Sequence, residues 1–332
     1  MMRFLILFCL PLLAYGQEDL FVGQTRFMQK INPSYFGFNN LNRVGILYNS
    51  MSVNNQQSEI DNNYIFGAFS FDNLNFSLGI DINSFQVRNT GFSNTSLNLT
   101  YVYKIQVSDG LFFLPAVRIG LGNSSVNASE LIFEDQLNTT GTINTESIDP
   151  IVNEGLAATY MDLGASFLVH SELFLAGLSF RNLNQPNVSY NNGEVSKKDI
   201  SITLNGGYEF DINPYNRGIL PDFSYLLAYG SITKLGSSFY TYFSQELQLG
   251  SLSIGLNELA SSVDSFNLNN VGASFGLSVE NFDFGIVYNL PFRNISKVYS
   301  PRTLEFYVTF DFSQFRRNRR GLFKRLQTDN YF

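Results

Sequence analysis

The sequence predicts an all-β protein, a transmembrane antiparallel β-barrel of about 14 strands whose N-terminal segment folds into the lumen. Apolar and polar residues alternate along most of the chain, most clearly in 304–312, where every even position is apolar. A strand with one face in lipid and the other in water gives this pattern. Only 15% of residues are charged, against about 25% in an ordinary soluble domain. No later stretch approaches the 18 or so consecutive apolar residues of a transmembrane helix.

Residues 1–16 have the pattern of a secretory signal peptide. Arg3 supplies the positive charge, 4–13 form an apolar core, and Ala14-Tyr15-Gly16 offers a cleavage site after Gly16. The alternative is a short membrane anchor, but this apolar run is far below the roughly 20 residues that span a bilayer. The single cysteine, Cys9, lies within this segment, so we expect no disulfide after cleavage.

Residues 17–40 are not strand-like and form an N-terminal extension or plug segment. The stretch contains several aromatic residues, which are depleted in disordered linkers. Its polar residues Gln24, Arg26 and Asn32 are suited to pair with a polar barrel wall. A disordered periplasmic lead-in is the alternative, and we favour a segment folded into the lumen.

Residues 41–313 contain the barrel itself. The alternation predicts strands near 41–52, 63–72, 75–87, 95–107, 111–122, 157–170, 172–182, 198–212, 220–234, 237–247, 249–258, 268–280, 282–291 and 302–313. An even number is typical of bacterial outer-membrane barrels, with short turns in the periplasm and long loops outside. A soluble all-β sandwich or soluble barrel would also alternate, but the low charge and the strand lengths favour a membrane barrel. With no tryptophan in the chain, Phe and Tyr must supply the aromatic girdles.

Charge divides the chain into an acidic body and a basic tail. The body, 17–315, carries a net charge of −13, which argues against nucleic acid as its partner. Residues 314–332 form a basic tail, expected in the periplasm, that contains Arg316, Arg317, Arg319 and Arg320. The tail is either simply solvated or contacts anionic headgroups or an acidic partner.

Catalytic and metal-binding patterns are weak. The single histidine, His170, is followed by Ser171 and Glu172 at an expected turn, and adjacent residues of an extended chain do not converge as a catalytic relay does. We interpret His170 as a polar turn residue. One histidine and no mature cysteine exclude the usual zinc sites. We therefore predict a protein that is not an enzyme and needs no cofactor.

Two segments resemble a known family. The first is Phe21 to Gly37, in which Asn32, Pro33, Tyr35 and Gly37 match a motif close to Asn-Pro-Ala-Tyr-Ala-Gly, preceded by a Gln-bearing stretch that includes Gln24. The second is an expected strand pair, 160–164 followed by 176–186. Its matching residues are Asp162, Gly177, Leu178, Asn184, Gln185 and Pro186.

These two segments resemble the PorP/SprF family of outer-membrane proteins of type IX secretion. Residues 288–289 and 300–305 are also similar to that family, but more weakly. In the second motif, Asn182 stands where many members have histidine. The resemblance implies a barrel akin to fatty-acid-transporter-like porins in the outer membrane of Gram-negative Bacteroidota.

The resemblance also implies a role in exporting or retaining a few large surface proteins, such as gliding adhesins, through their C-terminal sorting domains. The implied partners are such an exported protein, other secretion-system components and the lipid bilayer.

Three functions stay open from the sequence. The first is an accessory component of type IX secretion, which contacts its cargo through the long loops 123–154 and 185–197. The second is an outer-membrane transporter of hydrophobic solutes, which would need an apolar lumen. The third is a structural or adhesive surface protein, whose loss would impair neither secretion nor uptake.

Overall fold

The computed structural model describes residues 21–53, 58–71, 74–127, 136, 156–190, 195–214, 219–222, 224–262, 266–292 and 302–313. The strands are β1 Arg43–Val53, β2 Ser58–Phe71, β3 Phe76–Val87, β4 Phe92–Tyr103, β5 Ile105–Ser108, β6 Leu111–Val126, β7 Leu156–His170, β8 Phe174–Arg181, β9 Ser201–Asp211, β10 Tyr225–Leu235, β11 Ser238–Leu249, β12 Leu252–Ser262, β13 Phe266–Val279, β14 Phe282–Pro291 and β15 Arg302–Asp311. The helical segments are α1 Met28–Ile31, η1 Pro33–Asn40 and η3 Arg88–Thr90.

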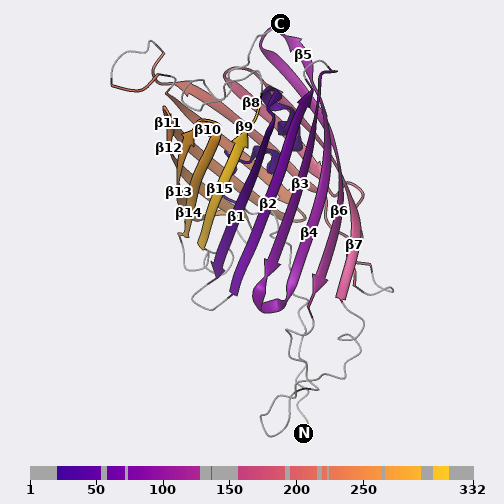
Figure 1. Ribbon diagram of the computed structural model, residues 1–332. Coiled ribbons are helices and arrows are strands. Elements are labelled where there is room, and N and C mark those ends of the chain that lie inside the picture. The colour runs from indigo at the N-terminus through magenta and orange to yellow at the C-terminus, as the bar shows by residue number, and fades with distance from the viewer. Residues whose placement is uncertain are drawn as a thin grey trace.

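The strands form a closed antiparallel barrel (Figure 1). Consecutive strands pair around the ring, β1 pairs with β15, and β4 pairs with β6. Within the described part of the chain, fourteen strands make up the wall, as the sequence predicted. The short strand β5, which pairs with the start of β6, lies outside this count and was expected as part of the preceding strand. No helix among the described residues is long and apolar enough to cross a membrane.

The barrel has two rims that differ in their connections. The rim where β1 begins and β15 ends, here called the terminal rim, lies at the top of Figure 1 and has tight turns such as the one between β11 and β12. In that turn Gly250 has a φ of +57°, a backbone conformation that glycine adopts without strain. The opposite rim, here called the loop rim, carries the connections from β6 to β7 and from β8 to β9. By the usual arrangement of outer-membrane barrels, the terminal rim is periplasmic and the loop rim extracellular.

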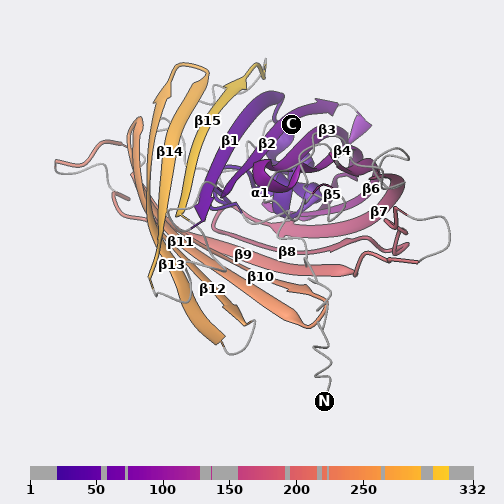
Figure 2. The same ribbon diagram turned by 90° about the horizontal axis from the view of Figure 1, so that it is seen from below.

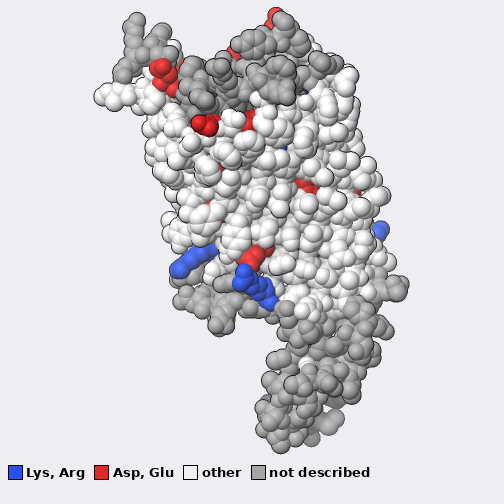
Figure 3. All heavy atoms as spheres, viewed as in Figure 1, with Lys and Arg blue, Asp and Glu red and all other residues white. Residues whose placement is uncertain are grey.

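The outer face of the barrel is apolar. Side chains such as Ile46, Ile65 and Leu99 are about half exposed, whereas the residues that alternate with them are buried in the lumen. Figure 3 shows that the middle of the visible surface carries few charged side chains, while most of the visible charges lie toward the two ends. This is the band that lipid requires of a barrel wall.

Aromatic rings form a girdle near the terminal rim. Phe71 stacks on Phe76 with ring centroids 4.8 Å apart, and Phe76 stacks on Tyr101 at 5.5 Å. Across the β14–β15 pair, Phe282 and Phe310 lie 4.7 Å apart. Phenylalanine and tyrosine therefore supply an aromatic girdle in a chain without tryptophan, as predicted.

The N-terminal segment fills part of the lumen. Residues 21–38, which include α1 and most of η1, are all buried, and Figure 2 shows α1 inside the ring of strands. From here on, residues 21–42 are called the plug. The plug continues into β1 at the terminal rim, where Asn42 is bonded to Ser313 and to the backbone N–H of Ser70. The expectation that this segment folds into the lumen is confirmed.

Candidate functional site

The start of the plug is held by a buried carboxylate on the barrel wall. Glu305 of β15 is fully buried and accepts hydrogen bonds from the backbone N–H groups of Val22 and Gly23, both at 2.6 Å. The side-chain amide of Asn49 on β1 donates a third bond at 2.7 Å. A Cβ at Gly23 would lie 2.9 Å from the Glu305 carboxylate, so the close approach favours glycine.

A buried ion pair fixes the next residues of the plug. Arg26 contacts Glu246 of β11 and also donates to the hydroxyl of Ser253 on β12. The hydroxyl of Thr25 donates to the second oxygen of Glu246 at 3.0 Å. A buried charge is strongly unfavourable without such a partner, so this pair ties the plug to one part of the wall.

The family-motif residue Gln24 lies in the same region. Its side-chain oxygen accepts a hydrogen bond of 2.6 Å from Ser231 of β10. The predicted role of Gln24 as a plug residue that pairs with the wall therefore has a geometric basis.

The two sequence motifs meet at Asn32. Its side-chain amide donates to the carbonyl of Phe167 at 3.0 Å and to Asn205 at 3.1 Å, while its oxygen accepts from the N–H of Ser34. A Cβ at Gly177 of β8 would lie 2.4 Å from the Asn32 amide nitrogen. Residues 145 positions apart in sequence thus form one contact, in which Gly177 leaves the space that Asn32 occupies.

The remaining plug-motif residues lie in or beside η1, near Asn205 of β9 and Val102 of β4. Pro33 begins η1, and the Tyr35 hydroxyl accepts a bond of 2.9 Å from Asn205. A Cβ at Gly37 would lie 2.7 Å from a methyl of Val102 on β4, so Gly37 permits the plug to lie against that strand. All five predicted plug residues therefore contact the wall or begin a plug helix.

Between the plug and the loop rim, the lumen contains a cavity of about 900 Å³. Its floor is made by plug residues, including Gln29 and Lys30, and its lining extends to the ends of β2, β6 and β10 at the loop rim. We call this cavity the vestibule. Its described walls are rich in amide and hydroxyl side chains, namely Asn83, Asn94, Asn98, Ser96, Ser124, Thr203, Thr233, Tyr64, Tyr160, Tyr190, Tyr240 and Tyr242.

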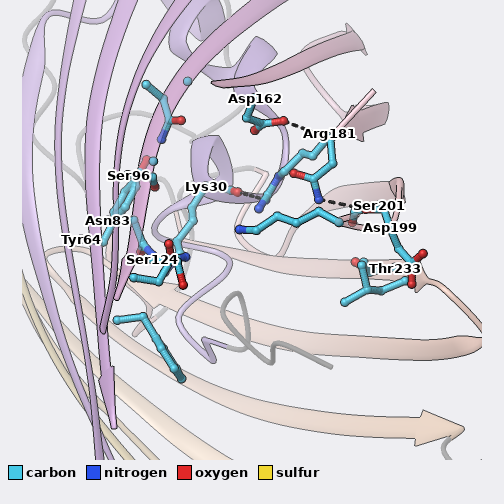
Figure 4. A pocket seen from close by; sticks show the side chains of 18 of the residues that line it. Lys30, Tyr64, Asn83, Ser96, Ser124, Asp162, Arg181, Asp199, Ser201 and Thr233 are labelled. Carbon is cyan, nitrogen blue, oxygen red and sulfur yellow. Dashed lines mark hydrogen bonds between the residues drawn. The ribbon is translucent and has the colours of Figure 1, made fainter. Parts of the chain in front are cut away.

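Charged groups cluster on one side of the vestibule (Figure 4). Arg181, at the end of β8, donates to the carbonyl oxygen of Lys30 on the plug. Asp162 of β7 accepts a bond of 2.8 Å from the N–H of Asn182 and lies 3.6 Å from Arg118 of β6. Plug and wall therefore share one network of charged and polar groups at this point.

The β8–β9 connection folds back onto the wall. The side chain of Asn184 donates to the carbonyl oxygen of Met161 at 2.6 Å and accepts from the N–H of Leu163 at 3.0 Å. These are the backbone groups of β7 that a neighbouring strand would otherwise bond. The N–H of Gln185 donates to Asn182, and the carbonyl of Pro186 accepts from Lys198. These bonds bring Lys198 to the vestibule, where it donates to the hydroxyl of Tyr160 at 2.8 Å.

The predicted strand-pair residues lie in three different places: beside the vestibule, against the plug and on the outer face. Asp162, Asn184, Gln185 and Pro186 organise the wall and the loop beside the vestibule, and Gly177 contacts the plug. Leu178 lies on the outer face of β8, between the inward-facing Gly177 and Ser179. Arg316, Arg317, Arg319 and Arg320 lie outside the described residues, as do the signal segment 1–16 and most of loop 123–154.

His170 is not the polar turn residue that we predicted. It is the last residue of β7, is 1% exposed, and lies between the rings of Phe38 and Phe112, with centroid distances of 4.7 and 5.3 Å. The plug covers it, and a local sequence pattern gives no sign of that cover. Glu246, Glu305 and Arg181 were missed as plug partners for the same reason, although a single charge at an inward position of an alternating strand is a usable signal.

Comparison with solved structures finds similarity to several outer-membrane proteins. Omp33 of Acinetobacter baumannii is 9% identical, with 82% of this chain and 100% of that chain covered and a TM-score of 0.44. The monoaromatic hydrocarbon channel TodX, as a deltaS2 mutant, is 9% identical, with 84% of this chain and 92% of that chain covered and a TM-score of 0.49. The monoaromatic hydrocarbon channel CymD is 8% identical, with 89% of this chain and 94% of that chain covered and the same TM-score of 0.49. No curated protein matches the chain.

The profile of the family described as type IX secretion system membrane protein PorP/SprF matches residues 16–310, which is most of the chain. The match includes both motif segments that meet at Asn32 and Gly177. The chain forms an outer-membrane β-barrel and belongs to the PorP/SprF family of type IX secretion system membrane proteins.

Proposed function

We propose that this protein is a non-enzymatic accessory component of type IX secretion that supports the export or surface retention of one or a few large surface proteins, of the gliding-adhesin kind. The observation that carries the proposal is the family match over 16–310, which includes the plug and the barrel. Its partners would be the C-terminal sorting domain of the exported protein and other components of the secretion system.

The lumen supports a binding role over passage of hydrophobic solutes. The plug is bonded to β15, β11, β12, β10, β7 and β9, so it is built into the barrel wall. The vestibule between the plug and the loop rim has a mixed lining, in which amide, hydroxyl and charged side chains stand beside apolar ones such as Ile60, Phe85 and Phe92. A solute that crossed the barrel would have to pass this plug, so the bonds between plug and wall favour a binding role over passage.

The loop rim is the surface that we assign to the exported protein. The loops 123–154 and 185–197 arise there, and the second of them is held against the vestibule by Asn184 and Lys198. The basic tail would remain on the periplasmic side, where it is suited to contact anionic headgroups or an acidic component of the machinery.

The proposal is tested by quantitative proteomics of the cell surface and the medium after clean deletion of the gene. We expect selective loss of one or two large surface proteins, with the rest of the secreted proteins unchanged. An unchanged surface proteome would refute the proposal, and impaired uptake of hydrophobic solutes in the same strain would favour a transporter. Re-expression of the wild-type gene is the control for both readouts.

A further inference from the structure

The charges of the vestibule differ from those of the rest of the barrel. Between residues 17 and 313 the chain has fourteen Lys and Arg and twenty-seven Asp and Glu. Among the residues that the structure describes, five basic ones line the vestibule, against three acidic ones. The basic residues are Lys30, Arg118, Arg181, Lys197 and Lys198, and the acidic ones are Asp81, Asp162 and Asp199. The described part of the vestibule lining therefore carries a net positive charge in an acidic protein.

The basic residues of the described lining come from separate elements, and the buried Lys30 ammonium itself lies over the rings of Phe21 and Tyr64. Lys30 belongs to the floor, Arg118 and Arg181 to the wall, and Lys197 and Lys198 to the β8–β9 connection. Figure 4 shows Lys30 and Arg181 beside each other in the cavity. Low-dielectric walls lined by one sign of charge concentrate the field and attract ligands of the opposite sign.

Two of the three acidic residues of the lining, Asp81 and Asp162, are bonded to other side chains or to the backbone. Asp81 accepts a bond of 2.7 Å from Asn98, and Asp162 accepts from the N–H of Asn182 while it lies beside Arg118. Arg181 and Lys198 are bonded too, but to neutral partners, the Lys30 carbonyl and the Tyr160 hydroxyl, and the described lining keeps a formal excess of positive charge. The surrounding Asn, Ser, Thr and Tyr side chains can donate to and accept from the amide groups of a peptide backbone.

We propose that the vestibule binds a carboxylate-rich, extended peptide segment that enters from the loop rim. The cavity, at about 900 Å³, lies within the range of roughly 300–1,000 Å³ that is usual for ligand pockets. This proposal rests on the proposed function, since an exported protein would present such a segment. Basic side chains would select the carboxylates, and the amide and hydroxyl walls would bond the peptide backbone.

The test measures binding of rhodamine-labelled octapeptides to the full-length protein in lipid nanodiscs, by fluorescence anisotropy at low and high salt. The probes are alternating Asp-Gly, Lys-Gly and Ser-Gly peptides. We expect the Asp-Gly peptide to bind at least tenfold more tightly than the other two, with an affinity that falls as salt increases. Equal binding of the three peptides would overturn the proposal.

Two double variants separate the vestibule from general electrostatics. K197Q/K198Q removes two positive charges from the vestibule, and K234Q/R302Q removes two from exposed positions of β10 and β15 near the same rim that do not line it. We expect at least a fivefold loss of Asp-Gly affinity in the first variant and less than a twofold change in the second. Equal losses would contradict a specific site. If polygalacturonate binds more tightly than the Asp-Gly peptide, the ligand class is an anionic saccharide and the peptide proposal is refuted.

The outcome is independent of the deletion experiment. If deletion depletes a surface protein but the Asp-Gly peptide does not bind, the vestibule proposal fails and the secretion role stands. If the peptide binds but the surface proteome is unchanged, the secretion role fails and an acid-selective site remains.

Discussion

The plugged part of the lumen and the vestibule differ in what their inward-facing polar groups contact. Where the plug fills the lumen, it bonds to the wall at several points, among them the Glu305 carboxylate, Glu246 and the Asn205 amide. In the half near the loop rim, a cavity takes the place of the plug, and its walls carry an excess of positive charge. The plugged part of the lumen is therefore built for rigidity, and the vestibule is built to receive a ligand.

The largest effect that this comparison predicts is for Arg26→Ala. The substitution leaves Glu246 buried without its cation, and breaking a buried ion pair in this way costs about 3–5 kcal/mol. We expect a lower midpoint of guanidinium unfolding in detergent micelles and faster trypsin cleavage within the plug.

The matched control for Arg26→Ala is Arg88→Ala at the loop rim. Arg88 also pairs with an aspartate, Asp61, which is buried but accepts a second bond from the Tyr48 hydroxyl; because the Arg88 side chain itself is 57% exposed, we expect a smaller loss than for Arg26→Ala. Similar losses in the two variants would show that the plug contacts do not differ in strength from surface contacts.

A smaller effect is expected for Gly177→Ala. The added methyl would lie 2.4 Å from the Asn32 amide nitrogen and 3.0 Å from the Phe167 carbonyl, and overpacking of this kind costs about 1–3 kcal/mol. Amide exchange should accelerate at the plug residues around Asn32. Gly230→Ala, whose Cβ would have no neighbour nearer than 3.5 Å, is the control and should exchange like the wild type.

The smallest effect is expected for Asn184→Ala, beside the vestibule. The side chain makes two hydrogen bonds to the β7 backbone at an exposed position, where water replaces them on substitution, so each contributes at the low end of about 0.5–1.5 kcal/mol. The Leu163 amide should exchange faster, with little change in the unfolding midpoint. Asn123→Ala removes a bond to the Thr159 hydroxyl instead, so Leu163 exchange should stay unchanged in that control.

The sequence predicts the wall well and the lumen contacts poorly, for one physical reason. A lipid-facing strand alternates residue by residue, so the ends of strands such as β14 and β3 lie within one residue of the predicted ranges. The contact between Arg26 and Glu246 joins residues 220 positions apart, and no local pattern encodes it. Resemblance singled out Asn32 and Gly177, but their meeting in space required the barrel to be closed.

The central claim is that this barrel is a plugged scaffold with a binding vestibule and not an open pore. Planar-bilayer conductance of the purified full-length protein tests it most directly, with Arg26→Ala measured in parallel. We expect the wild type to show no steady ion current and the variant to show intermittent openings as the plug loosens. A steady current through the wild-type protein, unaltered by the substitution, would contradict the account.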